Sequence, residues 1–355
     1  MATMERNTPL DPLAKKVKAD SSDDSAIHSP SIEVTRRHDK SLMMTIVHKI
    51  MKPFGGMLIK PPKDWPPGSQ QLTPSGGAKK RANITERRVQ DVYIYDMISK
   101  NASRTTAEGK GGSGRRRMYY LCGGGWRMPP SGNHWRFVVE LAKRLPDTTI
   151  SMISYPLAPK SPAPESFPLL LSLLKNLLQA SRDQNEHVIL GGDSSGGNLA
   201  LALPLAALHE DGDVALLPHA IFVMSPSTDL RRGNPDIQST QPLDPLLRIP
   251  FIKMTAFDWC GDWPPEDFRM SPLLAEDKLF QQLIARGVQI HGLTGSWDIL
   301  APDAVLFRNR ISELGVKGQW LDWDKQMHVF PLAFGYRLRE SREGMDWVTK
   351  VLAAS

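Results

Sequence analysis

The hexapeptide Gly192-Asp-Ser-Ser-Gly-Gly197 constrains the fold of this chain more than any other feature. The apolar run 187–190 precedes it, and the apolar-periodic stretch 198–203 follows it. A strand, a tight glycine turn that carries a serine, and a helix form the context in which Gly-x-Ser-x-Gly presents a nucleophile. The glycines remove Cβ atoms that would clash in such a turn, and the N–H groups of the helix N-terminus favour developing negative charge. The sequence therefore predicts a candidate nucleophile at Ser194.

Strand-like and helix-like segments alternate from residue 89 onward, which is typical of an α/β fold with a mostly parallel sheet flanked by helices. Strands are predicted at 92–95, 118–121, 149–153, 187–190, 220–224, 288–292 and 320–323. Helices are predicted at 133–145, 165–181, 197–209, 302–314 and 342–353. The stretch 227–270 is rich in Pro, Asp and Trp without a clear period, so we interpret it as an insertion after one strand.

The N-terminal part of the chain divides into two segments before the main domain. Residues 1–40 carry balanced charge and little apolar periodicity, which predicts a disordered segment. Residues 41–76 form a cap and linker segment, because 42–51 has helical apolar spacing and 61–76 is rich in Pro, Gly and Ser. The helix at 42–51 is too short to span a bilayer, and we favour a helix that covers the domain over one that contacts a membrane surface. The catalytic domain is predicted over 77–355.

The composition of the 355 residues excludes several classes of protein. Hydrophobic residues make up 41% and charged residues 23%, as in an ordinary globular protein, and only two cysteines occur. The N-terminus lacks the apolar run of a signal peptide, so a cytoplasmic location is expected.

The net charge of +6 arises in residues 79–117, which hold eleven Lys or Arg against four Asp or Glu. We interpret the Gly- and Ser-rich part of that stretch as a solvated flexible loop and expect no nucleic-acid partner, because no recognisable nucleic-acid-binding module accompanies it.

A base and an acid that could activate Ser194 are expected on loops after late strands. A serine hydroxyl needs a base to take its proton, and a carboxylate to orient that base. In this architecture the chain order is serine, acid, histidine. His328 follows the last predicted strand and is the predicted base. Asp298 follows the strand before it and is the predicted acid, in preference to Asp303, whose place in a first helical turn the helix dipole explains.

Backbone donors for an oxyanion are expected in Cys122-Gly-Gly-Gly-Trp126, which comes directly after a predicted strand. A glycine run allows N–H groups to turn toward one point without side-chain clashes. Gly124 and Gly125, together with the N–H of Ser195, are therefore predicted to form a three-donor oxyanion hole.

These motifs together resemble the α/β-hydrolases related to hormone-sensitive lipase, and within them a group of fungal esterase-like hydrolases (steryl acetyl hydrolase-like, of secondary metabolism). The resemblance covers roughly 85–352 and includes the hexapeptide, the glycine triplet, Tyr155-Pro-Leu-Ala-Pro159 and the loops of Asp298 and His328. It implies the same three catalytic residues and oxyanion donors, and a cap built from the N-terminal region and the insertion. The chain departs from the family pattern at three positions. Cys122 stands where the family has histidine, Ser195 where it has alanine, and Lys160 where it has an acidic residue.

The expected function is cleavage of a carboxylic ester through an acyl-enzyme, on a small apolar or secondary-metabolite substrate, with no metal or other cofactor. Five aromatic residues are predicted to line an apolar substrate pocket: Trp126, Trp135, Trp259, Trp263 and Phe330. Two alternatives remain open at this stage. One is thioester or amide cleavage, or acyl transfer, on the same triad in a fungal biosynthetic pathway, and the other is a non-catalytic ligand-binding protein on the same fold.

Overall fold

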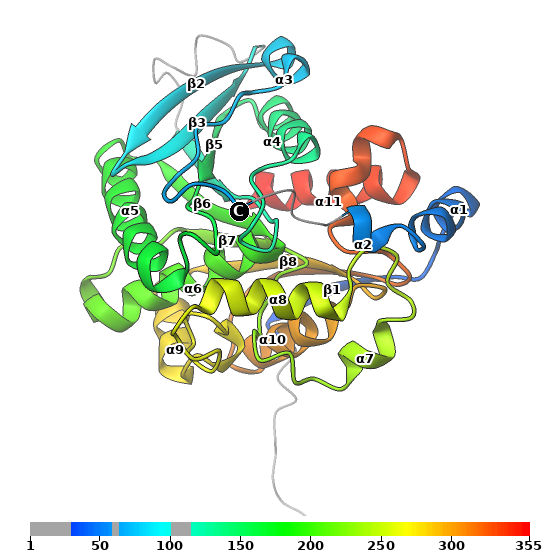
Figure 1. The fold of residues 1–355 in the computed structure, drawn as a ribbon. Coiled ribbons are helices and arrows are strands. Elements are labelled where there is room, and N and C mark those ends of the chain that lie inside the picture. The colour runs from blue at the N-terminus through cyan, green and yellow to red at the C-terminus, as the bar shows by residue number, and fades with distance from the viewer. Residues whose placement is uncertain (1–29, 59–63, 101–114) are drawn as a thin grey trace, which may run out of the picture.

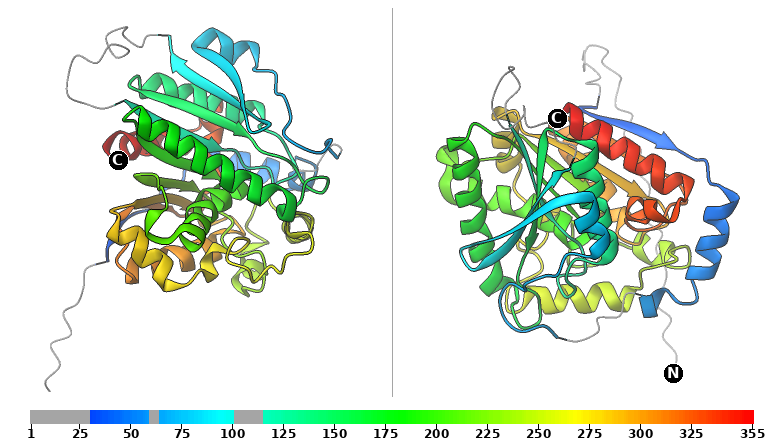
Figure 2. Two further views of the ribbon diagram at one scale, coloured as in Figure 1. Left: turned by 90° about the vertical axis from the view of Figure 1, so that its left-hand side faces the viewer. Right: turned by 90° about the horizontal axis from the view of Figure 1, so that it is seen from above.

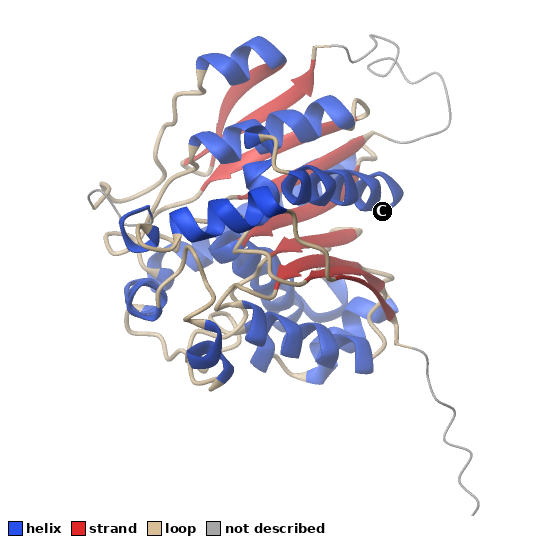
Figure 3. Cartoon of the chain, turned by 90° about the vertical axis from the view of Figure 1, so that its right-hand side faces the viewer, coloured by secondary structure: helices blue, strands red, loops and turns tan. Residues whose placement is uncertain are grey.

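A nine-stranded sheet runs through the molecule, and helices cover both of its faces (Figures 1 and 3). The computed structural model describes residues 30–58, 64–100 and 115–355. The strands are β1 (Ile32–Arg37), β2 (Ala82–Val89), β3 (Val92–Ser99), β4 (Arg116–Leu121), β5 (Thr148–Ser154), β6 (His187–Asp193), β7 (Ala220–Met224), β8 (Gln289–Gly295) and β9 (Gly318–Trp323). Their order across the sheet is β1-β9-β8-β7-β6-β4-β5-β3-β2.

Seven neighbouring strands, from β1 to β5 in the sheet order, pair in parallel, and β3 and β2 add antiparallel pairs at one edge. The mostly parallel α/β sheet predicted from the sequence is confirmed. Because the carboxyl ends of parallel strands meet at one edge of a sheet, the loops after β4, β6, β8 and β9 gather there.

The helices form two layers, and the strands alternate their side chains between them. The described helices of at least nine residues are α1 (Leu42–Met51), α4 (Gly132–Arg144), α5 (Ala163–Asp183), α6 (Ser194–Asp211), α8 (Ile249–Cys260), α9 (Asp277–Ala285), α10 (Ala301–Glu313) and α11 (Arg339–Ala354). The shorter ones are α2 (Gly55–Leu58), α3 (Gly76–Arg81) and α7 (Asp236–Thr240). Tyr119 and Leu121 of β4 pack in the core shared with α5 and α6, whereas Tyr120 of β4 and the next residue after the strand, Cys122, pack in the core shared with α4 and α11. Figure 2 shows these helices on the two sides of the sheet. This alternation is the period of two expected of a strand that is covered on both faces.

The N-terminal segment differs from its prediction. Residues 1–40 were expected to be disordered, but residues 32–37 form β1, which pairs in parallel with β9, and Ile32 is buried. Most side chains of this edge strand are polar, so its pairing partner rather than its apolar pattern fixes it in the sheet. Strand β2, which pairs with β3, was missed for the same reason. Residues 1–29 and most of the predicted basic loop, 101–114, lie outside the described residues.

Two segments predicted as a cap lie beside each other at the carboxyl edge of the sheet (Figure 1). Helix α1 spans the predicted 42–51, and α7 and α8 lie within the insertion 227–270. The side chain of Arg248 donates to the carbonyl of Lys52, and a Cβ at Gly55 would lie 2.6 Å from the carbonyl oxygen of Pro245. Of the helices in the described ranges, none is both long and apolar enough to cross a membrane.

Candidate active site

Ser194 occupies the turn between β6 and α6 in a left-handed backbone conformation, with φ of 52°. A positive φ is uncommon for a residue with a side chain, and such strain concentrates at functional sites. The turn is tight because α6 approaches β4 closely: a Cβ at Gly196 would lie 1.9 Å from the carbonyl oxygen of Leu121. The carbonyl of Ser194 also accepts a hydrogen bond from the Ser227 N–H at 3.1 Å. These contacts fix the backbone of Ser194 in the turn.

His328 and Asp298, which lie on different loops, form a buried hydrogen-bonded pair. The distance from His328 Nδ1 to Asp298 Oδ2 is 2.7 Å, and the side chain of Asp298 is inaccessible to solvent. An ionised carboxylate only accepts hydrogen bonds, so Nδ1 carries the proton and Nε2 is left free to accept one. Burial lowers the pKa of His328, but the charge of Asp298 and this hydrogen bond outweigh burial, and the pKa is raised above its ordinary value.

The loops of Asp298 and His328 are joined to each other through their backbones. The Trp297 N–H donates to the carbonyl of Gln326 at 2.9 Å, and this bond joins the two loops. The Val329 N–H donates to Ser225 Oγ at 3.1 Å, which ties the His328 loop to the segment after β7. The insertion adds a further anchor, because Asp244 accepts from the Ile299 N–H at 2.9 Å. Burial and the neighbouring Asp298 raise the pKa of Asp244 to about 6.

The structure separates the two candidate acids clearly. Asp303 accepts from Asn234 Nδ2 at 2.8 Å and makes no hydrogen bond to His328. Asp298 is therefore the carboxylate that orients His328.

The hydroxyl of Ser194 has no hydrogen-bond partner among the described residues. Catalytic hydrogen bonds are often long in unliganded sites and shorten when substrate binds.

The glycine loop after β4 is held at both ends by the segment that follows β5. Tyr155 Oη donates to the carbonyl of Cys122 at 2.7 Å, and the Ala158 N–H donates to the carbonyl of Trp126 at 2.8 Å. Within the loop, Gly124 has a φ of 142°, a conformation that side chains rarely adopt. Leu121 lies opposite Gly192 in the parallel register, so this loop leaves the sheet directly beside Ser194.

A buried polar cluster, which sequence reasoning missed, connects this loop to the residue before Ser194. Asp193 Oδ1 accepts from Tyr120 Oη at 2.9 Å, and Asp193 Oδ2 lies 3.1 Å from His134 Nε2. The Gly123 N–H also donates to Asp193. Burial raises the pKa of Asp193, but His134 and the hydrogen bonds from His134, Gly123 and Tyr120 outweigh burial and lower it. The signal available in the sequence was a carboxylate at a buried position of the hexapeptide, which needs donors.

The N-terminus of α4 determines which nitrogen of His134 faces Asp193. Ser131 and His134 form a capping box, in which the Ser131 N–H donates to His134 Nδ1 at 3.0 Å. Because Nδ1 accepts, the proton lies on Nε2, and His134 donates it to Asp193. The capping box thus fixes the tautomer that Asp193 requires.

Cys122 borders this cluster without a hydrogen bond from its thiol. Burial and the charge of Asp193 raise the pKa of the Cys122 thiol well above its ordinary value, so the thiol stays protonated. The Cys122, His134 and Asp193 side chains have potential metal-binding atoms within 4.8 Å of one another. The hydrogen bonds described above already use both nitrogens of His134 and both oxygens of Asp193, so they account for the cluster.

The structure divides the five aromatic residues predicted to line one pocket between separate parts of the core. Trp126 and Trp259 are buried and stack with a centroid distance of 5.7 Å. Trp135 packs edge-on against Tyr95, and Phe330 packs edge-on against Trp323, both in the core on the other face of the sheet. Trp263 contacts Phe167 and Arg269. Trp135 and Phe330 therefore lie on one face of the sheet, and Trp126, Trp259 and Trp263 lie on the other, so the predicted pocket residues are divided between the two cores.

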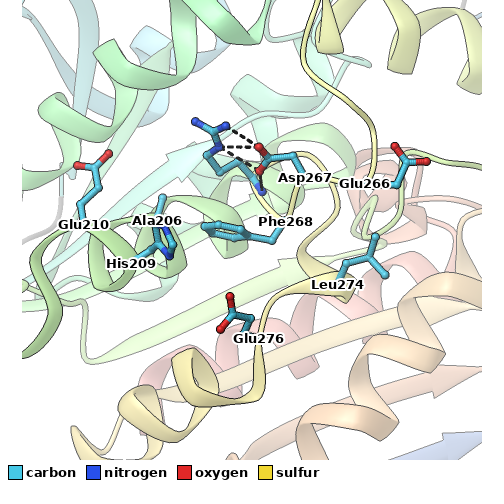
Figure 4. Close-up of a pocket in the computed structure, with 9 residues that line it drawn as sticks. Ala206, His209, Glu210, Glu266, Asp267, Phe268, Leu274 and Glu276 are labelled. Atoms are coloured by element: carbon cyan, nitrogen blue, oxygen red, sulfur yellow. Dashed lines mark hydrogen bonds and ion pairs between the residues drawn. The ribbon is translucent and has the colours of Figure 1, made fainter.

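A hollow of about 450 Å³ lies away from the catalytic candidates, at the C-terminal end of α6 (Figure 4). His209 and Glu210 line it from the helix, and Phe268 and Glu276 line it from the opposite side. A helix rises about 1.5 Å per residue, so its lining residue Ala206 lies roughly 18 Å along α6 from Ser194. This hollow is therefore separate from the candidate active site.

The sheet order, the strained serine after β6 and the late histidine–aspartate pair define the class of protein with an alpha/beta hydrolase fold. The alpha/beta hydrolase fold family matches residues 118–332, and the chain belongs to that family. An esterase of Acinetobacter venetianus is 29% identical over 225 residues, which cover 61% of this chain and 70% of that protein. The carboxylesterase/phospholipase LipF of Mycobacterium tuberculosis is 28% identical over 233 residues, 62% of this chain and 57% of its own length.

Solved structures show the same fold at lower sequence identity. A hormone-sensitive lipase from a metagenome library superposes with a TM-score of 0.67 at 19% identity, covering 90% of this chain and 99% of the other. A putative esterase from Staphylococcus aureus superposes with a TM-score of 0.67 at 21% identity, covering 80% of this chain and 87% of the other. By family, the chain is an alpha/beta hydrolase, and the two curated relatives named above are an esterase and a carboxylesterase/phospholipase.

Proposed function

We propose that this protein hydrolyses a carboxylic ester through an acyl-enzyme formed on Ser194. The observation that carries the proposal is the buried hydrogen bond between His328 Nδ1 and Asp298 Oδ2, on loops at the same sheet edge as Ser194. That bond leaves His328 Nε2 free to take the Ser194 proton. The relatives named as esterases support an ester as the bond that is cleaved.

In the proposed reaction, Ser194 Oγ attacks the ester carbonyl carbon as its proton passes to His328 Nε2. Asp298 stabilises the imidazolium that forms, and the backbone N–H groups of Gly124, Gly125 and Ser195 bind the oxyanion. His328 then protonates the leaving alcohol. In the hydrolysis of the acyl-enzyme, His328 takes a proton from water, and the water oxygen attacks the acyl carbonyl carbon. The bond to Ser194 Oγ then breaks, His328 returns the proton to Ser194, and the acid is released.

The Asp193 cluster supports the oxyanion loop in this proposal. The loop begins at Cys122, where the resembling family has histidine, so this chain needs another way to hold the glycines. Asp193 binds the Gly123 N–H, and His134 and Tyr120 hold Asp193 in turn. We therefore assign His134 and Tyr120 as positioning residues. The finer parts of the proposal, a small apolar or secondary-metabolite ester and membership of the fungal subgroup, rest on the sequence motifs alone.

Labelling with a fluorophosphonate probe tests the proposal, because the probe reacts covalently with an activated serine. The wild-type protein should label, and Ser194→Ala should not. Ser195→Ala is a matched control, because it removes the neighbouring hydroxyl but keeps the backbone N–H, and it should label as the wild type does. Equal labelling of wild type and Ser194→Ala would contradict the proposal and favour a non-catalytic ligand-binding role. A panel of esters, thioesters and amides then distinguishes ester hydrolysis from the other reactions of such a triad.

A further inference from the structure

Exposed apolar side chains gather on α1 and α2. Six of the thirteen large hydrophobic residues that are exposed in the described part of the chain lie within these two helices and the turn between them. They are Leu42, Met43, Ile46, Ile50, Phe54 and Met57, with exposed fractions from 43% to 76%. Single exposed apolar residues are ordinary, but a continuous group marks an interaction surface.

Helix α1 has two opposite apolar faces, and the domain covers one of them. Met44 and His48 are buried, one turn apart, and the His48 ring packs against Trp297, beside Asp298, at a centroid distance of 5.6 Å. At about 100° per residue, Leu42, Met43, Ile46 and Ile50 fall within about 100° of arc on the other side of the helix. Contact with the domain therefore explains one face and leaves the other without a partner among the residues that the structure describes.

The charged residues within the segment that carries α1 and α2 have a single sign. The sequence from residue 40 to residue 63 contains five lysines and no Asp or Glu. Of the described lysines, Lys49 lies at the edge of the exposed apolar arc, and Lys52 follows α1 directly; both are exposed. Figures 1 and 2 show α1 on the outer edge of the molecule, where a flat surface can reach it.

We propose that α1 and α2 dock this protein on the surface of an anionic phospholipid bilayer. Helix α1 lies in the plane of the surface, with Leu42, Ile46 and Ile50 in the boundary between headgroups and acyl chains. Lys49 and Lys52 pair with anionic headgroups. An apolar stripe flanked by lysines is the pattern of interfacial helices. The absence of acidic residues from the segment 40–63 favours lipid over a second copy of this chain, since a self-complementary contact between two such segments would bring lysines of like charge together.

This proposal does not depend on the proposed function, although it has a consequence for the site. Because the buried face of α1 packs on Trp297, the Asp298 loop would lie one helix thickness from the lipid surface.

Co-sedimentation of the full chain with vesicles tests the proposal. Vesicles of phosphatidylcholine with about one-third phosphatidylserine should carry the protein down at about 0.15 M salt, and pure phosphatidylcholine should carry far less. The double variant Lys49→Glu, Lys52→Glu should lower binding at least twentyfold, since each lysine near an anionic surface contributes roughly fivefold. The triple variant Leu42→Ser, Ile46→Ser, Ile50→Ser should lower it comparably.

Two control variants change similar side chains elsewhere on the surface. Val214→Ser removes a side chain that is 82% exposed, and Lys278→Glu reverses an exposed lysine far from α1 in the sequence. Both should bind as the wild type does, and all variants should keep the wild-type rate on a soluble ester. Failure of the wild type to bind anionic vesicles would overturn the proposal. A stable dimer in sedimentation velocity that the triple variant abolishes would also overturn it and assign the face to a second copy.

Discussion

At the scale of single residues, the hydrogen bond between Asp298 and His328 determines which proton each can move. In Asp298→Asn the amide can donate to Nδ1, which favours the tautomer with the proton on Nε2, and that tautomer cannot accept the proton of Ser194. We expect kcat for a p-nitrophenyl ester to fall about 10³- to 10⁴-fold, with the fold retained. Steady-state kinetics together with circular dichroism measure both effects.

Asp303→Asn is the matched control for this prediction, because it makes the same chemical change in the neighbouring helix. Burial raises the pKa of Asp303 to about 6, but this carboxyl binds Asn234 rather than His328. Its variant should keep kcat within about threefold, since surrounding hydrogen bonds contribute only modestly. A larger loss in Asp303→Asn than in Asp298→Asn would reverse the assignment of the acid.

The pKa of His328 predicts the acidic limb of the pH profile. Burial lowers this pKa, but Asp298 raises it overall above the ordinary value of 6.5. Only neutral His328 can act as the base, so kcat/KM should fall as the pH decreases through a midpoint above 6.5. A profile of kcat/KM between pH 5 and pH 9 measures it, and a midpoint below 6.5 would contradict the role of Asp298.

His134 and Cys122 flank the same carboxylate but should respond differently to substitution. His134→Ala removes a hydrogen bond to buried Asp193 and should lower kcat about 10- to 100-fold with KM nearly unchanged. His134→Gln can still donate to Asp193 and should recover part of the loss. Cys122→Ala should stay within about threefold of wild type, because Tyr155 binds the Cys122 carbonyl and the thiol makes no hydrogen bond. Loss of activity in Cys122→Ala would instead indicate a role for the thiol, such as metal binding.

At the scale of elements, His48 couples the attachment of α1 to pH. Burial, together with Lys40, lowers the pKa of His48 to about 3. Because the pKa of His48 is depressed in the folded protein, neutral His48 stabilises the attached helix at pH values above 6.5, the ordinary pKa of histidine. That contribution is lost as the pH falls below 6.5. At pH 5 the loss is about 2 kcal/mol, so amide exchange in residues 42–51, corrected for its intrinsic rate, should accelerate about 30-fold relative to pH 7.5. Glu340, whose pKa lies below 4.5, stays ionised throughout this range.

The variant His48→Leu should remove this pH dependence, because it keeps an apolar side chain under α1 and has no proton to bind. His209→Leu changes an exposed histidine elsewhere and should leave the dependence intact. If α1 exchanges equally at both pH values in the wild type, His48 does not control its attachment.

The elements also show where the sequence was informative. Buried apolar elements such as β6 and α6 were located from the sequence but predicted too short: the strand predicted at 187–190 runs to Asp193, and the helix predicted at 197–209 spans Ser194–Asp211. The edge strands β1 and β2 were missed, since half-exposed strands depend on a neighbour for pairing. At the site, motif and chain order predicted the Asp298–His328 contact. The His134–Asp193 contact could not be predicted, because it joins α4 to β6 across the fold, and neither the hexapeptide that contains Asp193 nor the capping box that contains His134 indicates the other as its partner.

At the scale of the whole molecule, the two edges of the parallel sheet contain different kinds of polar groups. The carboxyl edge holds strained and unpaired groups, including Ser194. The amino edge holds Arg117 of β4 and Glu186, which directly precedes β6; they form two hydrogen bonds of 2.6 and 2.9 Å, and Asp96 lies farther from Arg117, at 3.5 Å. The side chains of Arg117 and Glu186 are 15% and 4% exposed. Loss of Glu186 leaves the mostly buried charge of Arg117 with only the more distant Asp96 as a counter-charge. The same loss leaves the contacts of Ser194, Asp298 and His328 at the carboxyl edge unchanged.

Glu186→Gln should therefore separate stability from catalysis. We expect the free energy of unfolding to fall by about 3 kcal/mol, because Arg117 loses its main counter-charge, while kcat/KM at a temperature where the variant is folded stays near wild type. Thermal unfolding and ester hydrolysis measure the two quantities on one sample. Glu210→Gln, which breaks an exposed pair with Lys175, is the surface control and should cost less than about 1 kcal/mol. If Glu186→Gln lowers kcat/KM as strongly as Asp298→Asn does, the amino edge of the sheet also affects catalysis, and the assignment of stability to one edge and catalysis to the other is wrong.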